Sequence, residues 1–310
     1  MATRRLRRRV DGVLLLDKPA GVTSNGALQV AKRLFDAEKA GHTGTLDPFA
    51  TGLLPICFGE ATKFAQALLD ARKAYVATVH FGVRTSTGDI DGGVVAQSPV
   101  ALTRDAIEAA LPRFRGRIAQ LPPMHSALKR DGRPYYEYAR KGIELARTAR
   151  EVDIEELVLT GWTSPRATLR LACSKGTYVR VLAEDLGAAL GCGAHLAALR
   201  RSATGGFAID DAVTLDQLAD MTAGARDALL RPVETLLESL PALSVDAPGA
   251  AALRNGREVA APDQAPGRYR CRDPHQALVG VVEVAHGVLR AERLCRTDGA
   301  CATPREANAT

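Results

Sequence analysis

The sequence predicts an α/β (α+β) fold, with a large domain over residues 11–240 and a small β-rich module over residues 241–300. Three observations support this prediction. The length of 310 residues suits one large domain plus a small one, or two medium domains. Strand-like and helical runs alternate as far as Leu240. Beyond it the β-like runs are short and separated by Gly and Pro, at 268–272, 278–284 and 287–294.

The large domain begins with a predicted strand, a helix and a second strand. "GVLLLDKPAG" (12–21) is an apolar run closed by turn residues, which is typical of a buried strand. "TSNGALQVAKRLF" (23–35) opens with residues that cap helices and has apolar residues at helical spacing. "LLPICFG" (53–59) predicts another buried strand.

The next elements follow the same logic. "EATKFAQALLDAR" (60–72) predicts an amphipathic helix. "AYVATVHFGV" (74–83) alternates and predicts a strand that has Tyr75 and Val79 on one face. Thr103 is the expected N-cap of a helix in "TRDAIEAALPRF" (103–114).

Two strands and a helix are predicted before residue 192. "IEELVLTGW" (154–162) and "ATLRLACSKG" (167–176) have strand composition. "TYVRVLAEDLGAALG" (177–191) places Leu182, Leu186 and Leu190 on one stripe, which predicts a helix that ends at its glycines. Residues 121–153, between the predicted helix 103–114 and the predicted strand 154–162, are basic and rich in tyrosine. We expect them to form a protruding surface segment.

Composition bounds the partners. Lys and Arg exceed Asp and Glu by 41 to 35, and the pI is about 9.1, which suits contact with a polyanion. Residues 1–10 are rich in arginine and are interpreted as a basic arm that meets RNA phosphates. Residues 301–310 are expected to be a disordered tail.

Cysteine usage and hydropathy bear on the compartment. None of the six cysteines forms a Cys-x-x-Cys pair, so they are interpreted as reduced, buried thiols of a cytoplasmic protein. No apolar run approaches the roughly 18 residues that a membrane span needs. We therefore expect no membrane association, and the lack of ligand clusters in the sequence predicts no metal.

The stretch "GHTGTLDPFATG" (41–52) is the strongest candidate for chemistry. Pro48 stiffens the backbone after Asp47 and keeps Asp47 out of the helical region. The glycines permit turns and the close approach of a large ligand. Asp47 is therefore expected to be an accessible carboxylate on a rigid loop, which suits a nucleophile or a general base. An Asp-Pro pair by itself would more often be an ordinary turn.

Other motifs in the chain are weaker. "GHTG" matches the Gly-x-x-Gly of a KH domain, which is a short signal with two variable positions. The stretch lacks the lysine of a phosphate-binding loop. "TGDIDGG" (87–93) lacks the closing Glu of a calcium loop and is predicted to be a hairpin turn.

Residues 11–240 resemble a known family well, and the remainder of the chain resembles it weakly. "GHTGTLDPFATGLLPICFGEATKF" is similar to the signature of the TruB family of bacterial tRNA pseudouridine synthases. "LLLDKPAGVTS", "KAYVATVHFG", "LPPMHSALKRDGRPYYEYARKG", "CSKGTYVRVLAEDLG" and "GCGAHLAALRR" match further motifs in the same order. The resemblance implies the pseudouridine synthase fold, with a mixed, mostly antiparallel sheet flanked by helices and a PUA-like C-terminal module.

The resemblance also implies an activity. A T-loop uridine of tRNA would be flipped out and isomerised to pseudouridine without a cofactor. Asp47 matches the catalytic aspartate, and whether it attacks C1′ or removes a proton from C2′ stays open. The substrate-binding positions matched are His42, Tyr75, Tyr178, Arg180 and Leu199.

In the family, His42 corresponds to the residue that fills the vacated stack, and Arg180 to the arginine that pairs with the aspartate. Tyr75 matches the tyrosine that packs on the base, and Tyr178 and Leu199 match the lining of the uracil pocket. Residues 121–153 match a clamp over the T loop, whose expected phosphate contacts are Lys129, Arg130, Arg133, Arg140 and Lys141. The family implies a monomer with tRNA as partner and no obligate protein partner.

Two alternatives stay open from the residues alone. A non-catalytic protein that binds or folds tRNA would gain nothing from a fixed carboxylate at Asp47. A hydrolase with an aspartyl nucleophile would need a metal cluster or a second carboxylate. Asp89 and Asp91 are the nearby candidates, and both fall in the predicted turn.

Overall fold

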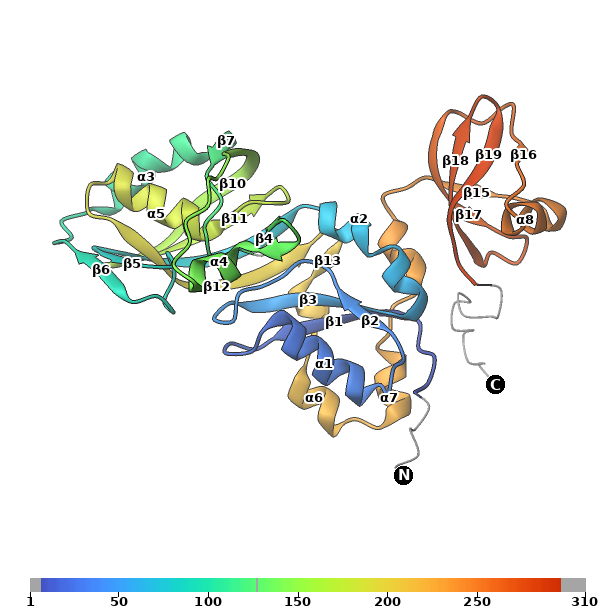
Figure 1. Ribbon diagram of the computed structural model, residues 1–310, viewed down its shortest axis with the longest axis horizontal. Coiled ribbons are helices and arrows are strands. Elements are labelled where there is room, and N and C mark those ends of the chain that lie inside the picture. The colour runs from blue at the N-terminus through green and yellow to red at the C-terminus, as the bar shows by residue number, and fades with distance from the viewer. Residues whose placement is uncertain (1–6, 127, 297–310) are drawn as a thin grey trace.

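The computed structural model describes residues 7–126 and 128–296. Its main feature is a ten-stranded sheet (Figure 1). Along the sheet the order is β14 (Val213–Thr214), β1 (Gly12–Lys18), β3 (Thr51–Phe58), β12 (Ala194–Thr204), β4 (Lys73–Phe81), β11 (Arg166–Cys173), β10 (Arg150–Thr163) and β7 (Gly116–Gln120), with β2 (Ala40–His42) paired to β3 and β13 (Phe207–Ala208) to β12.

Most neighbouring strands of this sheet run antiparallel. The exceptions are β1 with β14 and β3 with β12, which are parallel. The β3–β12 pairing is short and joins only Thr51 and Gly52 to Arg200 and Arg201. This junction lies between the part of the sheet built from the N-terminal strands and the part that contains β4, β11 and β10. The predicted α/β fold with a mixed, mostly antiparallel sheet is confirmed.

Helices lie on the large sheet, on the segment that projects from the body and beside the C-terminal module. The helices are α1 (Ser24–Leu34), α2 (Ala65–Asp70), α3 (Arg104–Ala110), α4 (Tyr135–Arg140), α5 (Val179–Ala189), α6 (Leu215–Asp220), α7 (Ala223–Ala228) and α8 (Ala247–Arg254). Helix α1 packs Ala27, Leu28 and Ala31 on the β1–β3 end of the sheet. Helix α5 packs Leu182 and Leu186 over β4, β11 and β12, as their spacing predicts.

Shorter elements complete the core. Single 3-10 turns are η1 (Gly59–Lys63), η2 (Leu111–Phe114), η3 (Ile209–Asp211) and η4 (Val233–Leu237). The helix predicted over 60–72 is wrong as one element. It is divided into η1 and α2 because Phe64 leaves helical geometry at φ −111° and buries its ring. The N-cap at Thr103 is confirmed, since its hydroxyl accepts a hydrogen bond from the Ala106 N–H.

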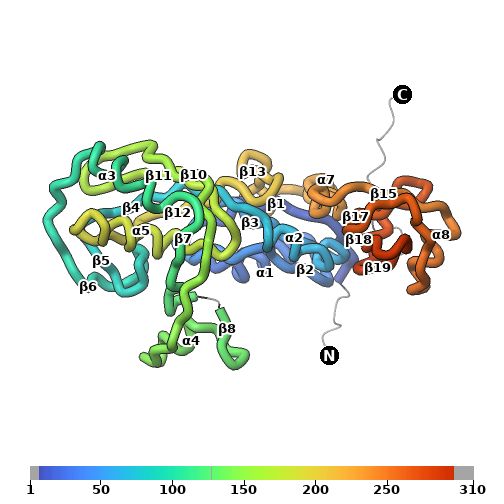
Figure 2. Tube along the Cα trace, turned by 90° about the horizontal axis from the view of Figure 1, so that it is seen from above, coloured from blue at the N-terminus to red at the C-terminus, as the bar shows by residue number. Residues whose placement is uncertain are grey.

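Two small hairpins stand apart from the large sheet. The first pairs β5 (Val83–Thr85) with β6 (Val94–Gln97), so "TGDIDGG" is the connecting turn, as expected. The second pairs β8 (Lys129–Arg130) with β9 (Arg133–Pro134) and leads into α4. Figure 2 shows β8 and α4 projecting from the body. The last residues of the predicted 121–153 segment, from Arg150 on, belong to β10 and pair with β7.

The C-terminal module is a five-stranded sheet with one helix beside it (Figure 1). Its order is β15 (Ala242–Ser244), β17 (Gly267–Arg272), β18 (Leu278–Ala285), β19 (Val288–Leu294) and β16 (Val259–Ala260). The β-rich prediction is confirmed, and helix α8 is an addition to it. Leu278, Val281 and Cys295 share an apolar cluster with Leu53 and Phe64 of the body.

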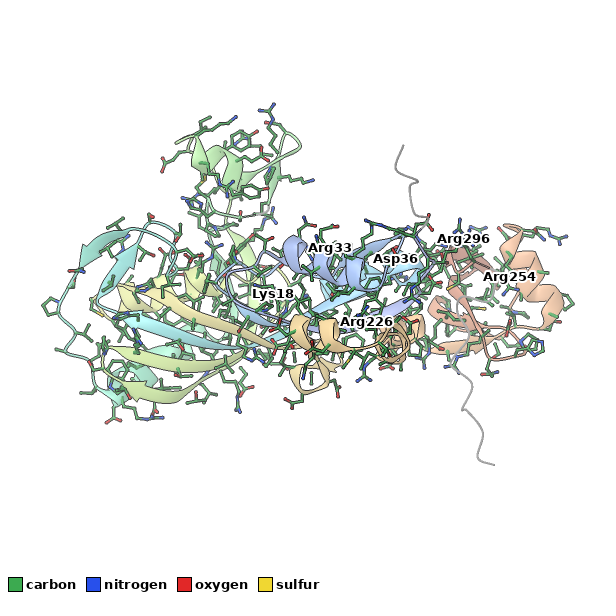
Figure 3. All side chains as sticks on the ribbon, turned by 90° about the horizontal axis from the view of Figure 1, so that it is seen from below. Lys18, Arg33, Asp36, Arg226, Arg254 and Arg296 are labelled. Atoms are coloured by element: carbon green, nitrogen blue, oxygen red, sulfur yellow. The ribbon has the colours of Figure 1, made fainter. Side chains whose placement is uncertain are left out.

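A buried carboxylate strengthens this seam. Glu60 accepts hydrogen bonds from the Arg296 N–H at 2.8 Å and from Lys63 Nζ at 2.7 Å. Arg296 is labelled in Figure 3, where it lies between the module and the body. The module is therefore attached through both apolar contacts and hydrogen bonds.

Residues 1–6 of the predicted arm and the whole predicted tail, 301–310, lie outside the described residues. Within the described part, Arg8 donates to Asp227 and to the Phe35 carbonyl, and Val10 is buried. Residues 8–10 therefore belong to the body rather than to an arm. No helix among the described residues is long and apolar enough to cross a membrane.

Candidate active site

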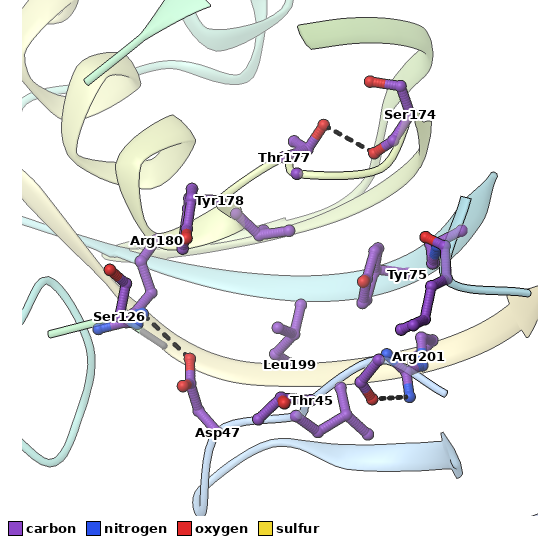
Figure 4. Close-up of a pocket in the computed structure, with 16 residues that line it drawn as sticks. Thr45, Asp47, Tyr75, Ser126, Ser174, Thr177, Tyr178, Arg180, Leu199 and Arg201 are labelled. Carbon is purple, nitrogen blue, oxygen red and sulfur yellow. Dashed lines mark hydrogen bonds and ion pairs between the residues drawn. The ribbon is translucent and has the colours of Figure 1, made fainter. Parts of the chain in front are cut away.

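A pocket of about 240 Å³ opens where the Asp47 loop meets β4, β12 and the start of α5 (Figure 4). The large sheet places these elements side by side, because β12 lies between β3 and β4. The lining residues are Gly44, Thr45, Leu46, Asp47, Leu69, Lys73, Tyr75, Ser126, Ser174, Gly176, Thr177, Tyr178, Val179, Arg180, Leu199 and Arg201.

The loop that carries Asp47 connects β2 to β3. Gly52, at the start of β3, has φ +103° and lies against the backbone of Arg201. A Cβ at this position would stand 2.3 Å from the Arg201 carbonyl oxygen. Glycine therefore allows β3 to approach β12 closely, which places Asp47 at the pocket.

Arg180 contacts four groups from three separate segments. Its Nε lies 3.0 Å from Asp47 Oδ2, and its Nη1 lies 3.2 Å from Asp89 Oδ2. It also donates to the carbonyls of Thr87, at 3.1 Å, and His125, at 2.7 Å. Arg180 is in the first turn of α5 and is 5% exposed. Such a guanidinium fixes the direction of the Asp47 carboxylate.

The Asp47 carboxylate is open to the pocket and enclosed elsewhere. Its side chain is 34% exposed, whereas that of Arg180 is 6% exposed. Burial raises the pKa of Asp47 above its ordinary value; Arg180 opposes the shift, and the nearby Asp89 adds to it. A carboxylate with a raised pKa is a stronger base than a free aspartate when it is ionised.

Tyr75 and Leu199 face the pocket from adjacent strands β4 and β12. Burial raises the pKa of Tyr75, so its hydroxyl stays protonated at neutral pH. Tyr178 stands at the N-cap of α5, where its backbone exchanges two hydrogen bonds with the side chain of Gln120, at 2.9 and 3.2 Å. Gln120 thereby links the end of β7 to the pocket wall.

Three buried cations in or beside the pocket donate their hydrogen bonds to backbone carbonyls. Arg201 is 1% exposed and donates to the carbonyls of Leu53 and Gly44. Lys73 donates to three carbonyls at the end of α2. Lys18 donates to two carbonyls in the turn that follows it, those of Pro19 and Val22, and to that of Pro48 in the Asp47 loop. Burial lowers the pKa of each lysine to about 8. These charges favour an anionic ligand.

The structure brings most of the predicted site residues together. Asp47, Tyr75, Tyr178, Arg180 and Leu199 line the pocket. His42 does not; it lies on β2, half-buried, with its Nδ1 buried and without a hydrogen-bond partner among the described residues. The predicted phosphate contacts are all exposed on the projecting segment, namely Lys129, Arg130, Arg133, Arg140 and Lys141.

Several residues of the site were missed by sequence reasoning. Asp89 was assigned to a turn, yet it is 4% exposed and bound to Arg180. Lys73 and Arg201 stand at the ends of the family motifs "KAYVATVHFG" and "GCGAHLAALRR", yet nothing in the local pattern marks these two charged side chains as buried. Within residues 7–126 and 128–296, no three His, Cys, Asp or Glu side chains could hold a metal ion.

Comparison with known proteins decides the family. Residues 32–179 match the model of the TruB family pseudouridylate synthase N-terminal domain, and residues 180–238 match the tRNA pseudouridylate synthase B C-terminal domain. The chain belongs to the TruB family. As a TruB-family member it is a tRNA pseudouridine synthase, an isomerase.

Full-length TruB-family relatives agree. The chain is 56% identical to the tRNA pseudouridine synthase B of Azoarcus sp. (strain BH72), over 94% of this chain and 97% of that protein. It is 54% identical to the protein of the same name from Burkholderia mallei (strain ATCC 23344), over 95% and 97%.

Solved structures support the TruB-family fold. The archaeal box H/ACA sRNP Nop10-Cbf5 complex contains a chain that matches with a TM-score of 0.70 and 26% identity, over 91% of this chain and 85% of that one. A Cbf5-Nop10-Gar1 complex gives a TM-score of 0.69 and 28% identity, over 88% and 78%.

Proposed function

We propose that this chain isomerises a T-loop uridine of tRNA to pseudouridine, with Asp47 as the catalytic residue. The observation that carries the proposal is the placement of the Asp47 carboxylate. It is ion-paired to a buried arginine, yet 34% exposed at the pocket whose walls include Tyr75 and Leu199. A surface that only bound phosphates would be weakened by such a carboxylate.

The reaction breaks the bond from ribose C1′ to N1, turns the base over and joins C1′ to C5. C5 then loses its proton to the solvent and N1 takes one up, so the product is an isomer of the substrate and this chemistry requires no cofactor. Asp47 either attacks C1′ as N1 leaves and is displaced when C5 bonds to C1′, or removes a proton from C2′ as N1 leaves and returns it when C5 bonds to C1′. Both routes need the ionised carboxylate, and Arg180 keeps that carboxylate oriented at 3.0 Å.

The remaining pocket residues have passive roles in this scheme. The target base leaves the T arm and enters the pocket, where Tyr75 packs on it and Tyr178 and Leu199 complete the walls. The raised pKa of Tyr75 favours this packing role over a role as base. His42 fills the position that the base leaves. The cations of the projecting segment contact phosphates.

The chain is further proposed to act as a cytoplasmic monomer without an obligate protein partner. This extends what the resemblance to the TruB family implies to a chain that matches tRNA pseudouridine synthases B over nearly their whole length. Light scattering of the purified protein, alone and with a T-arm hairpin, would give one chain per particle and one chain per RNA.

The test uses an unmodified T-arm hairpin that carries tritium at C5 of uridine. The wild-type chain should release tritium, and carbodiimide mapping should place pseudouridine in the loop. Asp47→Asn should release none while it still binds the hairpin. Asp220→Asn, at an exposed site on α6, is the matched control and should be fully active. Substantial turnover by Asp47→Asn would refute the catalytic assignment.

A protein that only binds or folds tRNA is the second candidate function. In that case neither the wild type nor any variant would release tritium, and the two aspartate variants would bind the hairpin equally well.

A further inference from the structure

The hydroxyl of Ser24 forms two hydrogen bonds with the backbone of Leu46, the residue that precedes Asp47. Ser24 Oγ donates to the Leu46 carbonyl at 2.9 Å and accepts from the Leu46 N–H at 2.8 Å. Ser24 is 2% exposed and Leu46 is 3% exposed, so water does not replace these bonds. One side chain therefore satisfies both polar groups of a buried peptide position.

The Asp47 loop has few other backbone partners. Residues 43–50 form neither helix nor strand. The Arg201 guanidinium donates to Gly44 O, and Ala50 N donates to Asp47 O. A residue such as Leu46 in this segment would otherwise bury an unpaired N–H and an unpaired carbonyl, which is unfavourable.

The residue after Asp47 is fixed from the same side. The Pro48 carbonyl accepts from the Gly21 N–H at 2.8 Å and from Lys18 Nζ at 3.3 Å. Lys18, Gly21 and Ser24 therefore form hydrogen bonds with the residues on both sides of Asp47. They leave only the Asp47 side chain to be directed, and Arg180 does that from the opposite wall.

Ser24 also joins two packing units. It is the first residue of α1, whose apolar side chains belong to the core over β1 and β3. Leu46 belongs to the core beneath α5. The position of the loop relative to Arg180 thus depends on this contact between the two cores.

We propose that Ser24 is a positioning residue for Asp47, which holds the Leu46 backbone so that the carboxylate meets the reacting ribose. This inference rests on the proposed catalytic role of Asp47. Ser24 does not line the pocket, so it acts through Leu46 and not on the substrate. A displacement of about 1 Å at a reacting group can lower a rate by about a hundredfold.

The neighbouring Thr23 provides a matched control. Its hydroxyl caps the same helix, accepting from the Gly26 N–H at 2.9 Å, and has no hydrogen bond to Leu46 in the described part of the chain. Ser24→Ala and Thr23→Ala each remove one hydroxyl from the start of α1. They differ in whether the Asp47 loop loses its partner.

The experiment measures single-turnover tritium release and hairpin affinity for both variants. Ser24→Ala should lower the rate at saturating enzyme by about tenfold to a hundredfold, with affinity within about twofold of wild type. Thr23→Ala should keep the wild-type rate, even if its melting temperature falls as much as that of Ser24→Ala. Equal rates for the two variants, or a loss in Ser24→Ala that lies entirely in affinity, would overturn the proposal.

Ser24→Cys guards against a folding defect. A thiol is somewhat larger than the hydroxyl, so it leaves no cavity, and it is a much weaker hydrogen-bond donor and acceptor. This variant should fold as the wild type does and should also react slowly. A fully active, folded Ser24→Cys would show that the two hydrogen bonds do not matter for the reaction.

The two proposals fail in different ways. If Asp47→Asn keeps turning over, the catalytic role of Asp47 is wrong, whatever Ser24→Ala does. If Asp47→Asn is inactive and the Ser24 variants react at the wild-type rate, only the positioning role is wrong.

Discussion

Asp89 and Arg180 form an ion pair of 3.2 Å in which each side chain is only 6% exposed. The same guanidinium reaches Asp47 at 3.0 Å. Arg180 therefore links the enclosed carboxylate of Asp89 to the exposed carboxylate of Asp47. The orientation of the Asp47 carboxylate is fixed before any substrate binds. Such preorganisation lowers the cost of aligning charges during a reaction.

Replacing Arg180 by lysine should lower the single-turnover rate by about a hundredfold or more, with the fold intact. Lysine keeps the charge but lacks the planar fork that contacts Asp47 and Asp89 together. Arg200→Lys is the control, since Arg200 pairs with Asp17 at a site where it is 44% exposed. Comparable rates in the two variants would mean that charge alone suffices.

Asp89→Asn should shift the pH dependence of the reaction. Asp89 contributes to the raised pKa of Asp47, so removing its charge lowers that pKa. The acid limb of the single-turnover rate should move to lower pH, while its plateau falls because Arg180 loses a partner. A pH profile with an unchanged acid limb would contradict the electrostatic link.

The wild-type rate should fall in acid at a pH above 3.8, the ordinary pKa of aspartate. Burial first of all raises the pKa of Asp47, so the carboxylate becomes protonated, and inactive, at a higher pH than a free group would. The check is the pH dependence of the rate at saturating enzyme, confined to the range in which circular dichroism shows the native fold.

The raised pKa of Asp47 should also make the folded protein less stable at neutral pH than in acid, whereas the reaction rate falls in acid. Because the folded pKa of Asp47 lies above the unfolded value, its contribution to stability is present in acid and is lost as pH rises through the folded pKa. Asp47→Asn should therefore melt at a higher temperature than wild type at pH 7, and the difference should shrink as the pH is lowered. If Asp47→Asn melted at a lower temperature than wild type at pH 7, the ionised Asp47 carboxylate would not be destabilising, and the prediction would be wrong.

Neutralising the projecting segment should weaken RNA binding in a salt-dependent way. Alanine at Lys129, Arg133 and Lys141 should each reduce the slope of log affinity against log salt by about one for the T-arm hairpin. Arg104→Ala is the control, because Arg104 pairs with Glu108 on α3. An unchanged slope in the triple variant would show that the segment does not contact phosphates.

Gly52→Ala should destabilise the protein by at least about 2 kcal/mol, because φ is +103° and the new Cβ would meet the Arg201 backbone at 2.3 Å. Gly41→Ala, in the same motif, would place its Cβ where no atom beyond the adjoining residues lies within 4 Å, and it should change little. Thermal unfolding of both variants is the measurement. Equal stability would mean that β3 does not need this close approach.

The local pattern was sufficient for much of the fold. The alternation along β4 predicted its buried face, which includes Ala77, Val79 and Phe81, and the leucine stripe predicted the packed face of α5. It was less successful at breaks, as in the 60–72 run, where the buried Phe64 divides the element. Periodicity reports how a segment is buried, whereas a break depends on what the segment packs against.

Contiguous motifs and local periodicity were enough to identify the family, most strands and helices of the core, and Asp47 as the candidate catalytic group. The distant groups that serve that carboxylate became visible in the folded chain. Asp89 reaches Arg180 across 91 positions of chain (180 less 89), and Ser24 reaches Leu46 across 22. Such contacts depend on the order of the strands and on the paths of the loops, and the spacing of residues along the chain does not reveal either.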